Sequence, residues 1–278
     1  MLVKKILKRL PQMLIVLFGI SFLTFLLTYI APGDPAEAMY EAAGILPTEQ
    51  QLETARISMG LDKPFAVQYF NWVTGVLRGD LGISFSKDIP VATALGQRLL
   101  PTLKVALLSM AMMIVVSVPL GVLSAVNRDG IADYIVRFLA FFGISVPGFW
   151  LGLLLMRFFG LTLRWFPVVS SRAGFKEMIL PCMTLAIAMS AKYTRQVRAS
   201  VLEELSQDYV IGAKARGVRY RKILWRHVFK NSLLPLITLL GISFGSLLGG
   251  TSIVEIIFSY PGLGNLAVGG GRARGESA

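Results

Sequence analysis

Residues 203–235 read EELSQDYVIGAKARGVRYRKILWRHVFKNSLLP, a polar and basic insert between two apolar runs. Such an insert has to lie in water, because charged side chains are costly inside a bilayer. Its composition predicts one helix from Glu203 to Arg216 and a second from Tyr220 to Lys230. Between them, Gly217 can adopt the left-handed backbone conformation that ends a helix. We therefore expect a helix, a turn and a helix on the aqueous side of a membrane protein.

The composition around this insert is that of a protein with several membrane spans. Apolar residues make up 54% of the 278 residues, charged residues only 16%, and the mean hydropathy is +0.64. A soluble domain of this length needs far fewer apolar residues. One cysteine and one histidine exclude a disulfide framework and a metal cluster built from those residue types within one chain. We expect no enzyme, because the sequence contains no nucleotide-binding, zinc-protease or serine-hydrolase motif.

The net charge of +12 is concentrated in two places. Lys4, Lys5, Lys8 and Arg9 carry +4 near the start, and residues 192–230 carry +7. Residues 32–97, in contrast, carry a net charge of −4. Basic segments beside membrane spans stay in the cytoplasm, so this distribution predicts a cytoplasmic N-terminus and a cytoplasmic insert, with no nucleic acid as partner.

Apolar runs on both sides of the insert predict five transmembrane helices and an all-α membrane protein. A helix needs about 20 apolar residues to cross the bilayer core. The runs cover residues 13–30, 100–126, 135–160, 178–191 and 233–257, with Pro119-Leu120-Gly121 breaking the second and Pro147-Gly148 breaking the third. The fourth run is short, and we include it because the basic insert has to return to the cytoplasmic side. The first run could also be a signal peptide, but its length favours a retained span.

The segment between the first two spans, residues 32–98, is expected to be extracytoplasmic and partly helical. Thr48 with Gln51 has the pattern of a capping box for a helix that ends near Met59. Pro64 then opens an amphipathic helix that ends by Gly79.

Several short motifs follow one another along the chain. They are Pro32-Gly33-Asp34-Pro35, Gly60-Leu61-Asp62-Lys63-Pro64, Gln68-Tyr69, Gly79-Asp80-Leu81-Gly82-Ile83-Ser84, the small residues Gly212, Ala213 and Ala215 before Gly217, and Phe258-Ser259-Tyr260-Pro261-Gly262-Leu263-Gly264. This set resembles the inner-membrane permeases of ABC importers in the dipeptide, oligopeptide and nickel branch. The resemblance implies a MetI-like bundle without a cofactor. It further implies a second permease subunit, two ATPase subunits and an extracytoplasmic substrate-binding protein as partners, all acting at the lipid bilayer.

By the same resemblance, the basic insert is the EAA loop, which docks on the ATPase. The residues that it implies for coupling are Ile211, Gly212, Ala213, Ala215 and Gly217, although Ile211 and Gly212 stand where the general pattern has Glu and Ala. A second feature, the glycines at 241, 245 and 249, forms a small-residue stripe on one helical face. Gly241, Gly245 and Gly249 pack either within this chain or against the second permease.

The resemblance also divides the chain. Residues 1–98 form the first span and the extracytoplasmic segment, and residues 99–266 form the permease transmembrane domain with the coupling loop at 203–230. Residues 267–278 form an atypical tail. The family has six spans, and this tail has no apolar periodicity, so the last span is expected to be missing through a frameshift or a truncation.

The substrate is the least constrained expectation. Ser117-Val118-Pro119-Leu120-Gly121, Asp133 and Phe149-Trp150-Leu151 resemble the nickel permeases more than the dipeptide ones, so we expect nickel, possibly as a chelate. A dipeptide or oligopeptide is the alternative. An ATP-independent channel, a structural membrane protein and an inactive truncated copy are further alternatives. No metal site supports nickel, since Cys182 lies in a span and His227 in the basic insert.

Overall fold

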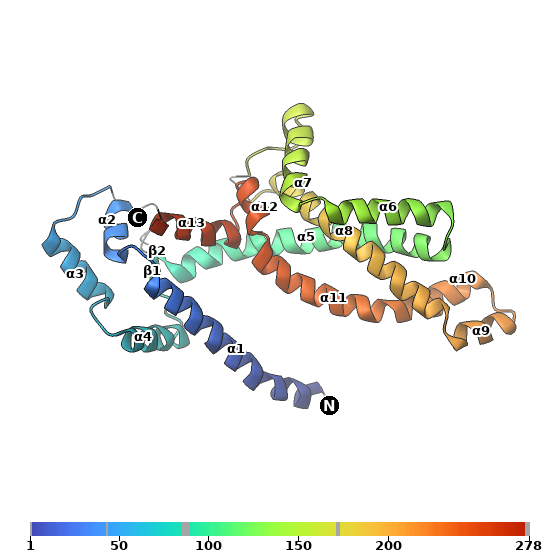
Figure 1. Cartoon of the computed structure of the whole chain (residues 1–278), viewed down its shortest axis with the longest axis horizontal. Helices are drawn as coiled ribbons and strands as arrows, with labels where there is room; N and C mark the ends of the chain where they lie inside the picture. The colour runs from blue at the N-terminus through green and yellow to red at the C-terminus, as the bar shows by residue number, and fades with distance from the viewer. Residues whose placement is uncertain (1, 43, 85–88, 171–172, 276–278) are drawn as a thin grey trace. The chain divides into compact units, whose positions relative to one another are not determined.

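The computed structural model describes residues 2–42, 44–84, 89–170 and 173–275, which are predominantly helical (Figure 1). They belong to two compact units. One unit comprises Met1–Gly96 with Gly269–Ala278, and the other comprises Gln97–Val268. The expected all-α class is confirmed.

Most of the described residues of the first unit lie in four helices and one pair of short strands. They are α1 (Leu2–Ile30), α2 (Pro35–Ala42), α3 (Glu49–Met59), α4 (Phe65–Leu77), and the antiparallel strands β1 (Ile83–Ser84) and β2 (Ile89–Pro90). The predicted capping box is present, and the backbone N–H of Thr48 donates to Oε1 of Gln51 at 2.8 Å. Gly60 ends α3 at φ 70°, and Pro64 precedes α4 as expected.

Aromatic side chains hold α4 against α1. Tyr69 is buried, and its hydroxyl lies 2.9 Å from the hydroxyl of Ser21. The rings of Phe22 and Phe25 each lie 5.4 Å from the ring of Tyr69 in edge-on geometry, which is favourable for aromatic pairs. Phe70, on the opposite face of α4, is 68% exposed. The amphipathic pattern therefore places one aromatic face of α4 on the first span.

The second unit takes α5 (Val91–Val126) from residue 97 onward and contains the remaining helices. They are α6 (Ile131–Ser145), α7 (Gly148–Leu155), the π-helix η1 (Met156–Thr162), α8 (Phe175–Leu205), α9 (Asp208–Ala215), α10 (Tyr220–Ile223), the π-helix η2 (Leu224–Val228), α11 (Phe229–Gly250), α12 (Ser252–Ile257), and α13 (Leu263–Gly275) as far as Val268. Figure 1 shows α8 running from α7 and α12 at one end to α9 and α10 at the other.

Three described helical segments are long and apolar enough to cross a membrane. They are Arg9–Ile30, Val91–Val126 and Tyr220–Gly249. The pair Ile131–Ser145 and Gly148–Thr162 makes a fourth if it is one span, and it bends by 99° at the expected Pro147-Gly148 break. The apolar run at 178–191 is helical within α8, but α8 is not among these segments because it is rich in charged residues towards both ends. The count of five spans therefore stays a prediction.

Two expected helix boundaries were wrong. The second span is not broken at Pro119, because α5 continues through both Pro101 and Pro119 to Val126. A proline removes only one backbone hydrogen bond, and neighbouring helices in a bundle can compensate for it. The insert does not contain one helix from Glu203 to Arg216. Instead α8 ends at Leu205, where the hydroxyl of Ser206 donates to the carbonyl of Glu203 at 2.7 Å, and α9 starts at Asp208.

The second predicted helix of the insert also has a different extent. Tyr220–Ile223 and Leu224–Val228 lead directly into α11, so one helical segment runs from the insert into the last apolar run. Near the C-terminus, α13 extends to Gly275 through part of the segment expected to be an atypical tail. Its 13 residues correspond to about 20 Å, which is less than the bilayer core of about 30 Å.

Candidate functional site: the α9 elbow and the buried charges behind it

The short helix α9 is fastened to the bundle by two apolar side chains. Val210 is fully buried and Ala213 is 6% exposed. Both belong to a cluster that α5, α8, α10, η2 and α11 complete, which we call the α9 cluster. Its buried members are Val122, Ala125, Val197, Val201, Val210, Ala213, Ile223, Leu224, Val228 and Leu236. The helix α9 therefore packs directly against α5, α8 and α11, the three long helices that contribute to this cluster.

The opposite side of α9 is open. Ile211 is 59% exposed, Ala215 and Gly217 are exposed, and Gly212 is half-buried. Of the five residues that the resemblance implied for coupling, Ala213 alone faces the interior of this chain. Ala213 therefore packs against this chain, whereas Ile211, Gly212, Ala215 and Gly217 remain accessible to a partner.

The predicted elbow at Gly217 is confirmed. Gly217 has φ +71°, its N–H donates to the carbonyl of Lys214 at 2.9 Å, and the N–H of Val218 donates to the carbonyl of Ala213 at 3.1 Å. These two bonds form a Schellman motif, which satisfies the last free carbonyl groups of the helix. The turn between α9 and α10 therefore has a defined geometry.

A second set of contacts ties α9 to both neighbouring helices. The hydroxyl of Tyr209 donates to Oε2 of Glu204 at 2.7 Å, and Nδ2 of Asn231 lies 3.4 Å from both groups. Burial, followed by the hydrogen bond to Glu204, raises the pKa of Tyr209 above its usual value. On the other side, the ammonium group of Lys214 lies 5.7 Å from the centre of the Tyr220 ring. The ends of α8, α9 and α11 are thus linked by polar as well as apolar contacts.

A buried ion pair lies deeper along α8. The side chain of Asp133 is fully buried, and Arg198 binds it with two hydrogen bonds of 2.7 Å, from Nε to Oδ1 and from Nη2 to Oδ2. The hydroxyl of Ser124 also donates to Oδ1, and the N–H of Asp129 donates to Oδ2 at 3.0 Å. Sequence analysis did not find this pair. The available signal was a carboxylate and a guanidinium that each flank an apolar run, where such groups have to be paired.

A second buried carboxylate lies near the other end of the unit. Glu255 is fully buried and accepts hydrogen bonds from the hydroxyls of Thr102 and Thr251 and from the N–H of Asn265, at 2.8, 3.0 and 3.1 Å. The structure places Glu255 inside the unit, among donors from α5, from α13 and from the residue that precedes α12.

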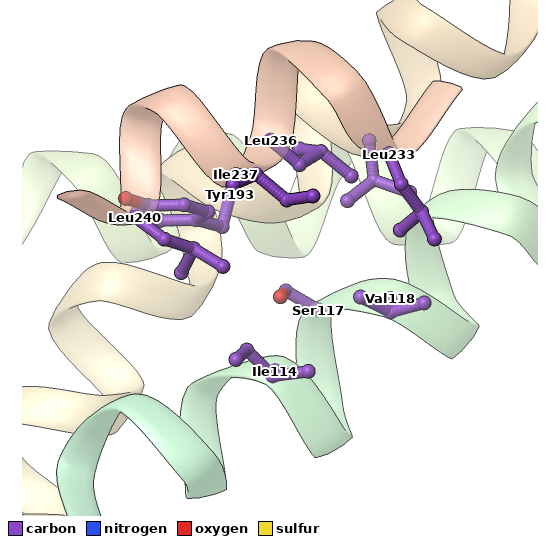
Figure 2. Close-up of a pocket in the computed structure, with 9 residues that line it drawn as sticks. Ile114, Ser117, Val118, Tyr193, Leu233, Leu236, Ile237 and Leu240 are labelled. Atoms are coloured by element: carbon purple, nitrogen blue, oxygen red, sulfur yellow. The ribbon is translucent and has the colours of Figure 1, made fainter. Parts of the chain in front are cut away.

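A small pocket of about 60 Å³ lies between α5, α8 and α11 (Figure 2). Ile114, Ser117 and Val118 line it from α5, opposite the α11 residues Leu233, Leu236, Ile237 and Leu240. The hydroxyl of Tyr193 donates to the carbonyl of Leu239 at 2.9 Å and lies 2.6 Å from Oγ of Ser243. The lining is therefore apolar, which suits hydrocarbon better than a peptide or a metal ion.

The glycine stripe on α11 is open. A Cβ atom added to Gly241, Gly245 or Gly249 would meet no atom within 4 Å among the described residues. The described part of this chain therefore does not fill the stripe. Within the same described residues, no group of three or more His, Cys, Asp or Glu side chains is placed to hold a metal ion. Cys182 is buried in α8, and His227 lies in η2.

Comparisons with known proteins agree with these features. Residues 117–276 match the family model of the binding-protein-dependent transport system inner membrane component, and residues 2–106 match the model of the N-terminal part of such proteins. The inward-facing MetNI methionine ABC transporter has a similar fold, with a TM-score of 0.52 and 18% identity over 64% of this chain and 81% of that one.

Curated relatives match over nearly the whole chain. The glutathione transport system permease protein GsiC of Pectobacterium atrosepticum is 39% identical over 96% of this chain and 84% of its own length. GsiC of Escherichia coli is 37% identical over 95% of this chain and 85% of its own length. The "Probable peptide ABC transporter permease protein y4tP" of Sinorhizobium fredii is 38% identical, also over 95% and 85%. This chain belongs to the binding-protein-dependent transport system inner-membrane components, and it is a multi-pass permease subunit of the peptide-type ABC importers, whose ATP hydrolysis takes place on separate subunits.

Proposed function

We propose that this permease subunit translocates a small peptide, with glutathione as the first candidate, into the cytoplasm. The names of its relatives support this proposal, since they read glutathione and peptide. They favour the peptide alternative over nickel, which was our first expectation from the sequence. The apolar pocket between α5, α8 and α11 suits neither a peptide nor a metal ion, so the substrate proposal rests on the relatives alone.

In this proposal α9 is the element that docks on the ATPase. Its outward residues Ile211, Gly212, Ala215 and Gly217 contact the partner, while Val210 and Ala213 transmit the movement into the α9 cluster. The observation that carries this role is the combination of an exposed face and a buried anchor on one helix of eight residues. Closure of the ATPase subunits then tilts α8 and α11, which exposes the substrate path to each side in turn.

The remaining partners follow from the membership of the family. A second permease subunit packs on the open stripe of Gly241, Gly245 and Gly249, since small residues allow close approach of helices in a bilayer. An extracytoplasmic binding protein delivers the substrate. The N-terminus lies in the cytoplasm, as the basic residues before the first span predict.

Uptake by the purified complex tests the substrate and the docking role together. The tagged chain is isolated in mild detergent, its co-purifying subunits are identified, and the complex is reconstituted into vesicles with its binding protein. Labelled glutathione, dialanine and nickel are then offered with and without internal ATP. We expect an ATPase subunit to co-purify and glutathione or dialanine to accumulate only with ATP. Accumulation of nickel alone would refute the peptide proposal.

The docking role has its own variant. Ala215→Trp places a bulky ring on the exposed face of α9 and is expected to abolish ATPase co-purification without loss of membrane insertion. Ala66→Trp is the matched control, because it introduces the same ring at an exposed helical alanine on α4. Normal recovery of the ATPase with Ala215→Trp would contradict docking through α9.

A further inference from the structure

The Asp133–Arg198 pair is a directional contact between two helices that otherwise meet at apolar residues. The helices α6 and α8 approach each other closely at small residues, since a Cβ on Gly143 would lie 2.9 Å from the Cβ of Ala191. Val136 and Ala140 are the other buried apolar residues of α6. Apolar contacts are non-directional, so they define the relative position of two helices along their axes less strictly than a bond of fixed geometry does.

The ion pair supplies that missing definition. Arg198 binds both oxygens of Asp133 at 2.7 Å, and such fork-shaped pairing fixes direction as well as distance. Ser124 adds α5 to the same carboxylate. Since the side chain of Asp133 is fully buried, a shift of α6 along α8 would cost it both bonds from Arg198. The only charge that moves with it in the described part of α6 is the half-exposed guanidinium of Arg137, 4.0 Å from Oδ2. The pair therefore holds α5, α6 and α8 in one register.

The position of the pair along the chain connects it with the docking element. Arg198 precedes the end of α8 at Leu205 by seven residues, about two helical turns, and α9 starts at Asp208. Val197 and Val201, which flank Arg198 on α8, belong to the α9 cluster. The buried members and partly buried neighbours of that cluster, among the described residues, include none from α6. A movement of α9 thus reaches α5, α8 and α11 through this cluster, and Asp133 adds a directional link from α8 to α6 beside the close approach of Gly143 to Ala191.

We propose that Asp133 and Arg198 are positioning residues that make α6, and with it the bent α6–α7 segment, follow α8 when the ATPase moves α9. This inference rests on the proposed importer function. It assigns to the pair a role in coupling, in addition to any contribution to the stability of the fold. Loss of the pair therefore uncouples ATP hydrolysis from transport, because α9 still docks while α6 no longer follows.

The test measures ATP hydrolysis and labelled glutathione uptake in the same vesicles, with the complete complex and its binding protein. In Asp133→Asn and Arg198→Lys we expect uptake per ATP hydrolysed to fall about tenfold, in the range of couplings that single residues carry. Asp129→Asn and Arg195→Lys are matched controls. Asp129 carries an exposed carboxylate four residues before Asp133, and asparagine tolerates the positive φ of residue 129. Arg195 is an exposed arginine on α8, three residues before Arg198. Both controls are expected to keep the ratio of the unmodified complex.

A covalent rescue separates coupling from simple stability. Cysteines at positions 143 and 191 place two Cβ atoms close enough for a disulfide after a small adjustment, since disulfides need about 3.8 Å between them. Introduced with Asp133→Asn, the oxidised bridge fixes α6 on α8 again and is expected to restore uptake per ATP, and reduction is expected to abolish the rescue. If Asp133→Asn prevents assembly, Arg198→Lys in its place gives the same comparison, because lysine keeps the charge but cannot make the two-bond pairing.

Two results would overturn the inference. Uptake and hydrolysis could fall in equal proportion, which would leave the pair a purely structural contact. The disulfide could form without restoring the ratio, which would separate the register of α6 from coupling. A complex of the unmodified chain that takes up neither glutathione nor dialanine with ATP would refute the proposed function instead, so the two failures are distinguishable.

Discussion

The hydroxyl of Thr102 lies between the backbone of Leu263 and the buried carboxylate of Glu255. It accepts a hydrogen bond from the N–H of Leu263 at 2.8 Å and donates one to Oε1 of Glu255 at 2.8 Å. Through this single side chain, α5 holds both the start of α13 and the carboxylate of Glu255 in α12. Both groups lie more than 150 residues after Thr102 in the chain. A Cβ on Gly262 would lie 2.1 Å from the same Oε1 atom, so the loop before α13 fits closely around Glu255.

Replacement of Thr102 by valine keeps the shape of the side chain and removes its hydroxyl. The N–H of Leu263 then loses its acceptor, and Glu255 loses a donor, in a buried place. We expect a loss of about 1–3 kcal/mol in the free energy of unfolding, which is the range for unsatisfied buried polar groups. Thermal unfolding of the purified chain measures it. Thr102→Ser retains the hydroxyl and is expected to be much milder, and equal effects of the two variants would contradict the hydrogen-bond role.

Gly121 marks a close approach of α5 to α8. A Cβ at this position would lie 2.5 Å from the Cβ of Val197 and 2.9 Å from the carbonyl oxygen of Thr194, which is backbone and cannot rotate away. Gly121→Ala is therefore expected to destabilise the chain by about 1–3 kcal/mol through overpacking, although alanine is the better helix former. The apparent melting temperature measures this loss. An unchanged or raised value would show that the two helices can separate freely.

Gly245 on α11 has open space around it, in contrast to Gly121. No described atom lies within 4 Å of a Cβ at this position, so Gly245→Leu is expected to change the stability of the isolated chain by less than about 0.5 kcal/mol. If the stripe is the seam with a second permease subunit, the same variant prevents co-purification of that subunit. Leu234→Ala, at an exposed residue of α11, serves as a control. Normal recovery of the second subunit with Gly245→Leu would contradict the seam.

Gly217 is constrained by its backbone and has open space around it. Its φ of +71° is unfavourable for residues with a Cβ, and a Cβ there would meet no atom within 4 Å. Gly217→Ala is expected to weaken the elbow by about 1–2 kcal/mol through backbone strain alone. Faster hydrogen exchange at the N–H groups of Gly217 and Val218 would report it. Gly217→Asn is expected to be milder, because asparagine tolerates this conformation. Gly212→Ala, inside α9, should leave the exchange rates unchanged.

Local signals in the sequence predicted several parts of this structure correctly. The capping box at Thr48 and Gln51, the proline before α4, the bend at Pro147-Gly148 and the left-handed Gly217 depend on backbone preferences of a few adjacent residues. Such preferences act over one or two helical turns, so the amino acids concerned are sufficient evidence. The class of the protein followed in the same way from composition and charge.

The ends of helices were harder to predict from the sequence, because they depend on how the helices pack against one another. Pro119 lies inside α5, where Gly121 allows close contact with α8 and the bundle supports a continuous helix. Ala213 looked like one of several small residues available to a partner, but its side chain lies in the α9 cluster. A single sequence does not distinguish the buried side of an eight-residue helix from the exposed side when both carry small or apolar residues.

The sequence by itself determined that this is an all-α membrane protein of the ABC permease type, with a basic insert that turns at Gly217. These properties follow from composition, charge distribution and short motifs, which act locally. The tertiary structure alone decided that Asp133 meets Arg198 and that Thr102 meets Glu255. Each of these pairs joins residues at least 65 positions apart. Their contact depends on how the helices pack, because a buried charge is stable only where the fold brings partners to it.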